Sequence, residues 1–266
     1  MNDQREEWYD AAAKVAVTIV DVTAAAQALA RGHLSGPVAA HYLTQGLAAA
    51  ALLGAETGEK DETVIVQMKC TGPLGGFNVE CTAEGTLRGY TEKKTLDDFD
   101  GLGRPKDEQV LGSCQFQITR SVPGRILSQG LANSLNGYLV QSLQRRAVMA
   151  LAAEVSDEVE ILAARGVLVE ALPDSELAKA EDGYRRLEAA VNGAKLTGAS
   201  RTLLARLGYP HAELKKTTPL KFACRCSPDR AAAMLAALSL EERASLPDTI
   251  DITCHMCGRI FTLRTK

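Results

Sequence analysis

The chain has 266 residues, which is enough for one core domain and one or two small modules. Hydrophobic residues make up 46% of the chain and charged residues 24%, a composition typical of a soluble globular protein. The net charge of −3 disfavours a protein whose main role is to wrap nucleic acid, because such proteins carry a basic excess, so no nucleic-acid partner is expected.

The N-terminus is polar and acidic, and no apolar signal-peptide core follows it. The longest apolar run, residues 47–55, is far shorter than the roughly 20 residues of a membrane helix. We therefore expect a cytoplasmic protein that does not bind membranes. Cysteines are normally reduced in that compartment, so clustered cysteines indicate metal binding or redox activity rather than structural disulfides.

Residues 1–173 are predicted to form one mixed α/β core domain within an overall α+β fold. Strands are predicted where β-branched residues cluster or alternate with polar ones, over residues 14–22, 63–70, 77–81, 85–91, 110–120, 125–128 and 167–172. Helices are predicted over residues 23–31, with Thr23 as the cap, over 39–55, with Pro37 near the start, and over 131–144. The pattern over residues 159–163 is ambiguous between strand and other structure.

Residues 174–218 are predicted to form a helical linker. Asp174 is a suitable N-cap, and the apolar residues after it recur at spacings of three and four, which places them on one face of a helix. This stripe consists of Leu177, Ala180, Tyr184, Leu187 and Val191. The simplest interpretation is an ordinary helix packed on the core domain. A second helix is predicted over residues 199–207.

Residues 219–266 are predicted to form a small module around two close pairs of cysteines. One residue separates Cys224 from Cys226, two separate Cys254 from Cys257, and 27 residues lie between the pairs. Four thiolates are the number that a structural zinc site requires, and a glycine after the second pair suits a turn beneath the metal. We therefore predict one Zn²⁺ per chain, bound in the reduced state. Inert buried thiols are a weaker explanation, because free cysteines rarely cluster in pairs.

Two short helices are predicted between the cysteine pairs. Ser227 and Pro228 are typical of a helix start, and residues 239–242 form a capping box. Strands are predicted over residues 250–253 and 260–263. A module of this size buries too little surface to be stable alone, so it should unfold when it loses its metal ion.

The remaining candidate ligands are expected to have other roles. His255 lies within the second cysteine pair, but four cysteines already complete a tetrahedral site. Cys70, Cys81 and Cys114 lie in apolar strands without a cysteine at metal-binding spacing. They are predicted to be core residues, because cysteine is among the most buried residue types.

Two other functions fit part of this pattern. A zinc-ribbon adaptor for nucleic acids or proteins would explain the four cysteines, but not the acidic charge or the large α/β domain. A thiol–disulfide oxidoreductase could use Cys254 and Cys257, but such motifs usually open a helix near a βαβ unit, and here a glycine and a strand follow. No phosphate-binding loop or catalytic triad is recognisable, so we do not expect an enzyme.

Several motifs in the same chain resemble those of one known family. Besides the cysteine pattern, they are residues 72–75 (GPLG), 85–90 (GTLRGY), 137–142 (GYLVQS) and 164–173 (ARGVLVEALP). With these motifs the chain resembles the bacterial 33-kDa heat-shock protein family, the redox-regulated holdase chaperones. The resemblance covers nearly the whole chain, and the zinc pattern is its most specific part. Residues 227–230, Gln144 and Arg165 depart from the family pattern, but none of them is a zinc ligand.

The resemblance implies a redox switch in the last segment. Oxidation would form the disulfides Cys224–Cys226 and Cys254–Cys257, expel zinc, unfold the module and destabilise the linker. Family members then hold unfolding or oxidatively damaged proteins during oxidative and heat stress, without ATP and often as homodimers. On this basis the apolar stripe of the linker is a hypothetical client-binding surface.

Overall fold

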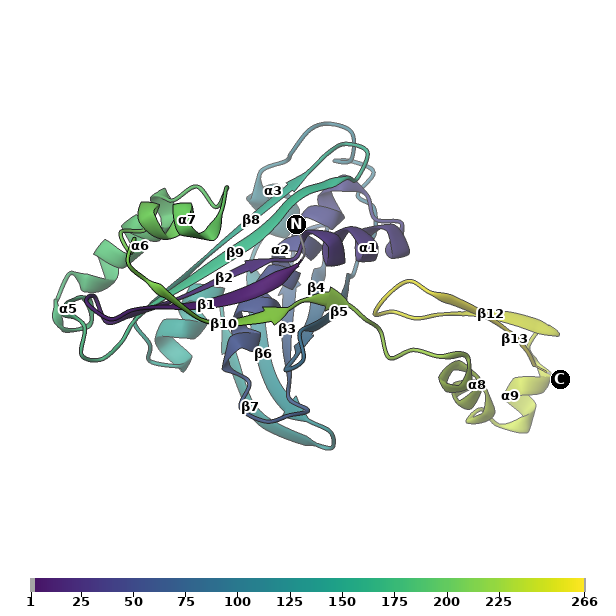
Figure 1. The fold of residues 1–266 in the computed structure, drawn as a ribbon. Helices are drawn as coiled ribbons and strands as arrows, with labels where there is room; N and C mark the ends of the chain where they lie inside the picture. Colours follow the sequence, from purple (N-terminus) through teal and green to yellow (C-terminus); the bar gives the residue numbers. More distant parts are fainter. Residues whose placement is uncertain (1–2, 266) are drawn as a thin grey trace.

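Two β-sheets enclose the apolar helix α2 (Pro37–Leu53), and a small C-terminal module projects from one end of this body (Figure 1). The computed structural model describes residues 3–265. Residues 1, 2 and 266, the outer ends of the first and last predicted segments, lie outside the described part. Nearly all side chains of α2 are buried, because the helix contacts strands of both sheets.

Among the described residues, one helical stretch is long and apolar enough to cross a membrane by length and composition. It combines α2 with the 3₁₀ turn η1 (Gly54–Glu56) and has a mean hydropathy of 1.2. However, 89% of it is buried inside the protein. A helix that is apolar on all sides is typical of the centre of a protein core, and this is where α2 lies.

The first sheet is antiparallel and carries the linker on its outer face. Its strands in spatial order are β10 (Glu213–Pro219), β1 (Gln4–Asp10), β2 (Val15–Asp21), β9 (Ile161–Ala171) and β8 (Ala147–Val155). The linker helices are α5 (Glu176–Lys179), α6 (Gly183–Gly193) and α7 (Ser200–Arg206). A second apolar core lies between these helices and the sheet, and its members include Trp8, Val17, Val148, Leu187, Val191, Leu203 and Leu204.

The second sheet lies on the other side of α2. Its strands in spatial order are β11 (Lys221–Phe222), β5 (Thr86–Thr91), β4 (Gly76–Thr82), β3 (Thr63–Cys70), β6 (Cys114–Val122) and β7 (Arg125–Ala132). Only the β11–β5 pair is parallel. Helix α1 (Thr23–His33) contacts α2, β5 and β11, so its C-terminal end faces the C-terminal module.

The C-terminal module consists of two short helices and a hairpin (Figure 1). Helix α8 (Pro228–Ala236) and helix α9 (Leu240–Ala244) precede the antiparallel strands β12 (Thr249–Thr253) and β13 (Ile260–Arg264). These four elements confirm the order predicted for the segment between and after the cysteine pairs.

The predicted helix over residues 131–144 is wrong, and the strand predicted over 110–120 starts too early. β7 continues to Ala132, and only a short α4 (Leu135–Gly137) and the π-helix η2 (Tyr138–Ser142) follow. The stretch before β6 is the helix α3 (Asp107–Leu111). Gly112, with a φ of +60°, separates α3 from the strand, a conformation that favours glycine.

Strands β1, β8 and β10 were not predicted. β1 and β10 are rich in charged residues, and β8 is rich in alanine, which favours helices. Pairing with neighbouring strands overrides these local preferences, since β8 is held along its whole length by β9. Such pairing cannot be recognised from the pattern of one segment.

Two predicted helix caps are also wrong. The N-cap of α1 is Val22 rather than Thr23, and the carboxylate of Asp3 accepts hydrogen bonds from the amides of Ala24 (2.8 Å) and Ala25 (2.6 Å). A group distant in sequence therefore satisfies the amides that a cap residue usually satisfies.

In the linker, the N-cap of α5 is Ser175 rather than Asp174, and its Oγ accepts from Ala178. The predicted continuous helix breaks after Lys179. Gly183 packs so closely on the carbonyl of Leu177 that a Cβ would lie 1.8 Å from its oxygen, so only glycine fits there.

A largely buried ion pair joins the start of β3 to the neighbouring strand β6 in the second sheet. The carboxylate of Glu62, just before β3, accepts a 2.6 Å hydrogen bond from Nε of Arg120 on β6 and two bonds from the amides of Gly58 and Glu59. Burial alone would raise the pKa of Glu62, but the bond from Arg120 and the two amide bonds outweigh it and hold the pKa below its ordinary value.

We predict that Glu62→Gln destabilises the protein by about 2 kcal/mol at pH 7 and flattens its response to acid. Because the folded-state pKa is lowered, this stabilisation is complete above the ordinary glutamate pKa of 4.5 and is lost as pH falls through the folded-state value. Urea unfolding at pH 7 and pH 3.5 measures both effects. The exposed Glu59→Gln is the control and should change neither. Equal losses at both pH values for Glu62→Gln would contradict the prediction.

Candidate metal centre

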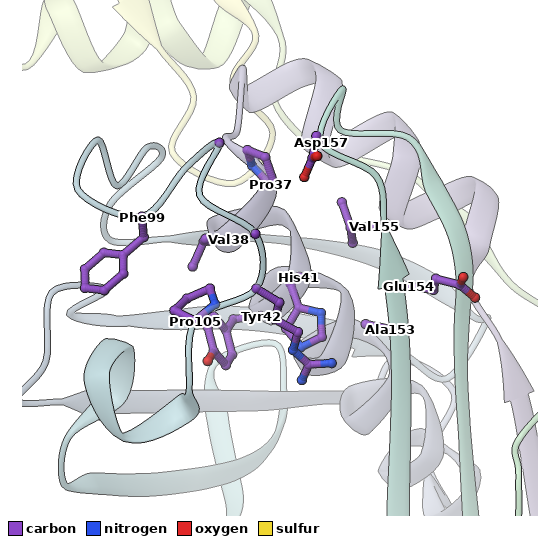
Figure 2. Close-up of a pocket in the computed structure, with 13 residues that line it drawn as sticks. Pro37, Val38, His41, Tyr42, Phe99, Pro105, Ala153, Glu154, Val155 and Asp157 are labelled. Atoms are coloured by element: carbon purple, nitrogen blue, oxygen red, sulfur yellow. The ribbon is translucent and has the colours of Figure 1, made fainter.

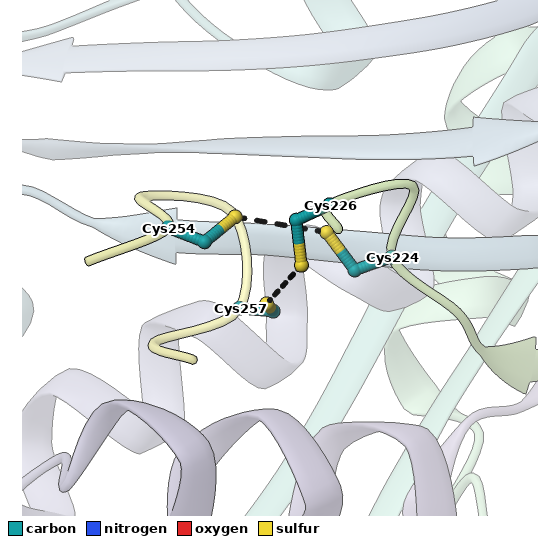
Figure 3. A group of neighbouring side chains, drawn as sticks. All are labelled: Cys224, Cys226, Cys254 and Cys257. Carbon is teal, nitrogen blue, oxygen red and sulfur yellow. Dashed lines mark hydrogen bonds between the residues drawn. The ribbon is translucent and has the colours of Figure 1, made fainter. Parts of the chain in front are cut away.

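The four cysteines of the C-terminal module converge on one point (Figure 3). Cys224 and Cys226 lie on the segment between β11 and α8, and Cys254 and Cys257 lie on the turn between β12 and β13. The four sulfur atoms lie within 4.8 Å of one another. The sulfurs are 3.8 Å apart for Cys224 and Cys254, and 3.5 Å apart for Cys226 and Cys257. The fold therefore brings together all four residues that the sequence predicted as ligands.

The spacing of the sulfurs fits a tetrahedral metal ion. Zn–S bonds of about 2.3 Å place the corners of a tetrahedron about 3.8 Å apart. The observed separations match this value, and they exceed the roughly 2.05 Å of a disulfide bond, so all four are free thiols. Four soft sulfur donors in this arrangement suit zinc better than the hard cations magnesium and calcium.

The turn that carries Cys254 and Cys257 has the local geometry its sequence predicts. The carbonyl of Cys254 accepts hydrogen bonds from the amides of Cys257 (3.3 Å) and Gly258 (2.8 Å), and its own amide donates to the carbonyl of Arg259. Gly258 has a φ of +72°, a left-handed conformation that favours glycine. The backbone therefore folds tightly around the two sulfurs.

The segment between the cysteine pairs is shaped by two helix caps. Ser227 Oγ accepts from the amide of Arg230 at the start of α8, and Pro228 is its first residue. Ser239 and Glu242 form a reciprocal capping box at the start of α9, as predicted. These caps fix where the two helices begin.

Four thiolates at this spacing would repel one another electrostatically. Burial opposes ionisation of Cys224, but hydrogen bonds from the amide of Cys226 and from the guanidinium of Arg88 outweigh it and lower the pKa of Cys224 to about 7. Burial, together with the thiols of Cys224 and Cys254, raises the pKa of Cys226 and of Cys257. Four thiolates can therefore coexist here only with a cation among them, and a divalent metal ion supplies that charge.

The cysteine turn is docked directly on the core. The amide of Gly89 on β5 donates to the carbonyl of Met256 (3.1 Å). A Cβ on Gly32 of α1 would lie 2.7 Å from the carbonyl oxygen of Cys257, and one on Gly258 would lie 1.9 Å from that of Gly32. Such a close backbone contact requires glycine on both sides. No motif in the sequence indicated this contact.

Charged and aromatic groups extend this contact between module and core. Nη1 of Arg88 lies 3.9 Å from Sγ of Cys224, and Nε of Arg88 donates to Glu80 at 2.6 Å. Glu80 also pairs with Arg225 (3.3 Å). His255 is not part of the four-cysteine cluster, and its ring instead meets the edge of Tyr90.

The other predicted residues lie away from the cluster. Cys81 is buried in the core as predicted, whereas Cys70 and Cys114 are half-buried at its edge. In the linker stripe, Leu187 and Val191 are each only 1% exposed, because they pack on the first sheet. Leu177, Ala180 and Tyr184 of the stripe are half-buried. The C-terminal half of the stripe is therefore fully covered and the N-terminal half only partly.

A hollow of about 170 Å³ lies away from the cysteines, between the start of α2, the loop before α3 and the end of β8 (Figure 2). Its lining includes Phe99, Pro105, Arg104 and His41. Nε2 of His41 is buried and has no hydrogen-bond partner among residues 3–265. Burial, followed by the charge of Arg104, lowers the pKa of His41 to about 4, so the ring is neutral at pH 7. No motif in the sequence marked this hollow.

The fold and the cysteine centre define an α+β protein with a small module suited to zinc binding and redox regulation. A model of the Hsp33 protein family matches residues 3–264. The chain therefore belongs to the Hsp33 family, which is a family of chaperones. The resemblance found in the motifs is thereby confirmed.

Individual relatives agree with this assignment. The 33 kDa chaperonin of one strain of Thermus thermophilus is 27% identical, over 92% of this chain and 79% of the relative. That of Cyanothece sp. is 29% identical, over 86% of this chain and 83% of the relative. The crystal structure of the 33 kDa chaperonin of Thermotoga maritima has the same fold, with a TM-score of 0.86 at 17% identity, and the match covers 100% of this chain and 96% of that one.

The module has very little apolar surface to hold it together without a metal ion. In the described residues after Phe222, the buried apolar side chains are those of Ala231, Leu235 and Cys257. A structural zinc ion contributes roughly 10–16 kcal/mol of apparent binding energy to such modules. Metal binding and folding of this segment should therefore be one process.

We predict that chelation of the metal ion makes residues 223–265 sensitive to protease while the two sheets stay resistant. Limited trypsin digestion followed by mass spectrometry measures this. Cys257→Ser should produce the same pattern without chelator, because it removes a ligand. Cys81→Ala is a matched control, since it removes a buried thiol outside the module and should leave the module protected. A module that stays resistant after complete chelation would contradict the prediction.

Proposed function

We propose that the chain is an ATP-independent holdase chaperone that oxidation activates. In the reduced, inactive state one zinc ion is held by Cys224, Cys226, Cys254 and Cys257. The ion links the two arms of the module, which are the segment with Cys224 and Cys226 and the hairpin turn with Cys254 and Cys257. The observation that carries this proposal is the tetrahedral spacing of four free sulfurs in a module that buries almost nothing else. Membership of a chaperone family supports the activity.

Oxidation of the thiols is the activating step. Each disulfide forms when two thiolates give two electrons to one peroxide molecule, which takes up two protons and leaves as two molecules of water. Four thiolates therefore consume two peroxide molecules and form two disulfides. A disulfide sulfur is a poor metal ligand, so the chain then loses its affinity for zinc.

The choice of disulfide partners decides whether the module unfolds. Cross-pairs such as Cys224–Cys254, whose sulfurs are 3.8 Å apart, would replace the metal as a link between the two arms and keep the module folded. Local pairs, Cys224–Cys226 and Cys254–Cys257, leave the arms unconnected. We propose the local pairs, which the resemblance to the family implies and which would let oxidation unfold the module.

Unfolding of the module would loosen the linker through the strands that join them. Leu220 is buried and β11 pairs with β5, and both lie directly before Cys224. β10, which precedes them, is the edge strand of the first sheet, and most of its side chains are exposed. An edge strand with few buried side chains is held mainly by its backbone hydrogen bonds. β10 should therefore separate easily from β1 once β11, the next strand along the chain, is released from β5.

Release of the linker would expose two apolar surfaces. One is the stripe from Leu177 to Val191, and the other is the face of the first sheet beneath it, which includes Trp8 and Val17. Apolar patches of this kind bind the exposed hydrophobic segments of unfolding proteins.

We further propose that the active chain is a homodimer, acts in the cytoplasm and is not an enzyme. Its partners would be unfolded or oxidatively damaged proteins rather than nucleic acids.

A combined zinc and aggregation assay tests the proposed function. Zinc release is followed with a chromophoric chelator during treatment with peroxide at mild heat, and samples are added to a client protein that unfolds on heating. The reduced chain should hold about one zinc and leave light scattering unchanged, and the oxidised chain should be zinc-free and suppress scattering until a reductant is added. Zinc release without any gain of holding activity would refute the proposal and favour a zinc-ribbon adaptor.

We predict that replacing Leu177 and Tyr184 together by glutamine lowers the capacity of the oxidised chain to hold clients several-fold. Both side chains are half-buried in the reduced state, so folding should be retained. Lys179→Gln with Arg185→Gln is the matched control, because both residues are exposed outside the stripe. Light scattering with a fixed amount of client gives the capacity. Equal capacities for the two double variants would exclude the stripe as a client surface.

A further inference from the structure

Two cysteines outside the metal centre lie opposite each other on adjacent strands of the second sheet. Cys70 is the last residue of β3 and Cys114 is the first residue of β6, and they are direct partners in the antiparallel register. Both are free and half-buried, at the edge of the main core. Their side chains continue the row of Met68 and Phe116, which are partners two residues along the same strands.

The backbone hydrogen bonds around Cys70 and Cys114 show which of the two kinds of antiparallel residue pair they form. The amide of Thr71 donates to the carbonyl of Ser113 (3.0 Å), and the amide of Cys70 donates away from β6, to Gly75. Cys70 and Cys114 therefore form a non-hydrogen-bonded pair, the type in which Cα atoms approach to about 4.5 Å and the side chains are closest. This separation lies within the roughly 4.4–6.8 Å range of disulfide bonds.

We propose that Cys70 and Cys114 are a second redox pair, which closes into a cross-strand disulfide when the chain is oxidised. One thiol attacks a peroxide and becomes a sulfenic acid with loss of one water, and the other thiol attacks that sulfur with loss of a second water. One peroxide is thus reduced for each disulfide formed. The step needs no metal ion and no residue of the four-cysteine centre, so it is independent of the proposed function.

The surroundings of the pair indicate when it closes. Burial raises the pKa of both thiols, and the pKa of Cys114 is raised further by its neighbour Cys70. The reactive thiolate is therefore scarce at neutral pH, and the pair reacts slowly. It stays reduced under brief oxidation and closes under sustained oxidation.

The disulfide would stabilise β4 and β5, the strands of the second sheet that lose contacts when the C-terminal module unfolds. We call this its stapling role. It closes a loop over residues 71–113, which contains β4 and β5. In the folded module, β11 pairs with the outer edge of β5, and Met256 accepts from Gly89 in the same strand. Without these contacts β5 becomes an unprotected edge strand. A covalent closure of the loop limits its unfolding.

Peptide mapping of the unmodified protein tests the pair directly. The chain is treated with peroxide for increasing times, free thiols are alkylated, and the product is digested with trypsin and a glutamate-specific protease. Cleavage after Glu80 separates Cys70 from Cys81, so that each cysteine is assigned to its own peptide. We expect a disulfide-linked peptide pair with Cys70 and Cys114, which appears after zinc is released. Alkylation of both residues after sustained oxidation, long after the four-cysteine centre is completely oxidised, would overturn the proposal.

The thermal stability of the oxidised core tests the staple. We expect sustained oxidation to raise the melting temperature of the two sheets by several degrees, and Cys70→Ser or Cys114→Ser to abolish this increase. Cys81→Ala is the matched control and should keep the increase, because Cys81 is buried opposite Val64 rather than a cysteine. A linked pair without any increase in melting temperature would overturn the stapling role.

Discussion

The convergence of four sulfurs is the constraint on which the C-terminal part of the structure depends. Two short segments, 30 residues apart in the case of Cys224 and Cys254, are held within a few ångströms of each other with almost no apolar packing between them. The hairpin, the two capped helices and the glycine turn bring the sulfurs together, but they bury too little surface to stay folded alone. In the proposed mechanism, a module built in this way is stable only while its sulfurs share a cation, so its stability would depend on the oxidation state of the thiols.

The docking of the module would transfer this dependence to the rest of the chain. Gly32 and Gly258 permit a backbone contact that no larger residue would allow, and it holds the cysteine turn against α1 and β5. Directly before the cysteines the chain forms β11 and β10, the edge strands of the two sheets. In the proposed mechanism, the metal centre would therefore stabilise both sheet edges and, through β10, the end of the linker that covers the outer core.

Much of this arrangement could be predicted from the sequence where the signals are local. The candidate ligand set follows from cysteine spacing, the caps of α8 and α9 from Ser227 and Ser239, and the central helix from a sequence rich in alanine and leucine with few helix breakers. Features that depend on distant parts of the chain could not be predicted. Asp3 replaces the expected cap of α1 from 21 residues away, β8 is a strand only because β9 pairs with it, and Gly183 breaks the linker helix through its contact with Leu177.

The same distinction applies to the candidate sites. The pairing of Cys70 with Cys114 depends on the register of β3 and β6, which a sequence pattern does not reveal. The covered state of the linker stripe likewise follows from tertiary packing, because a helix stripe looks the same whether it is buried in the resting protein or only released on activation.

Hydrogen exchange of the zinc-bound and the oxidised, zinc-free chain tests most directly whether the metal centre controls the linker. The account predicts that residues 223–265 exchange at unfolded rates after oxidation, and that β10, α6 and α7 lose much of their protection, while α2 and β9 keep theirs. Loss of protection in the module with unchanged protection in α6 and β10 would contradict the account, because the module would then unfold without releasing the linker.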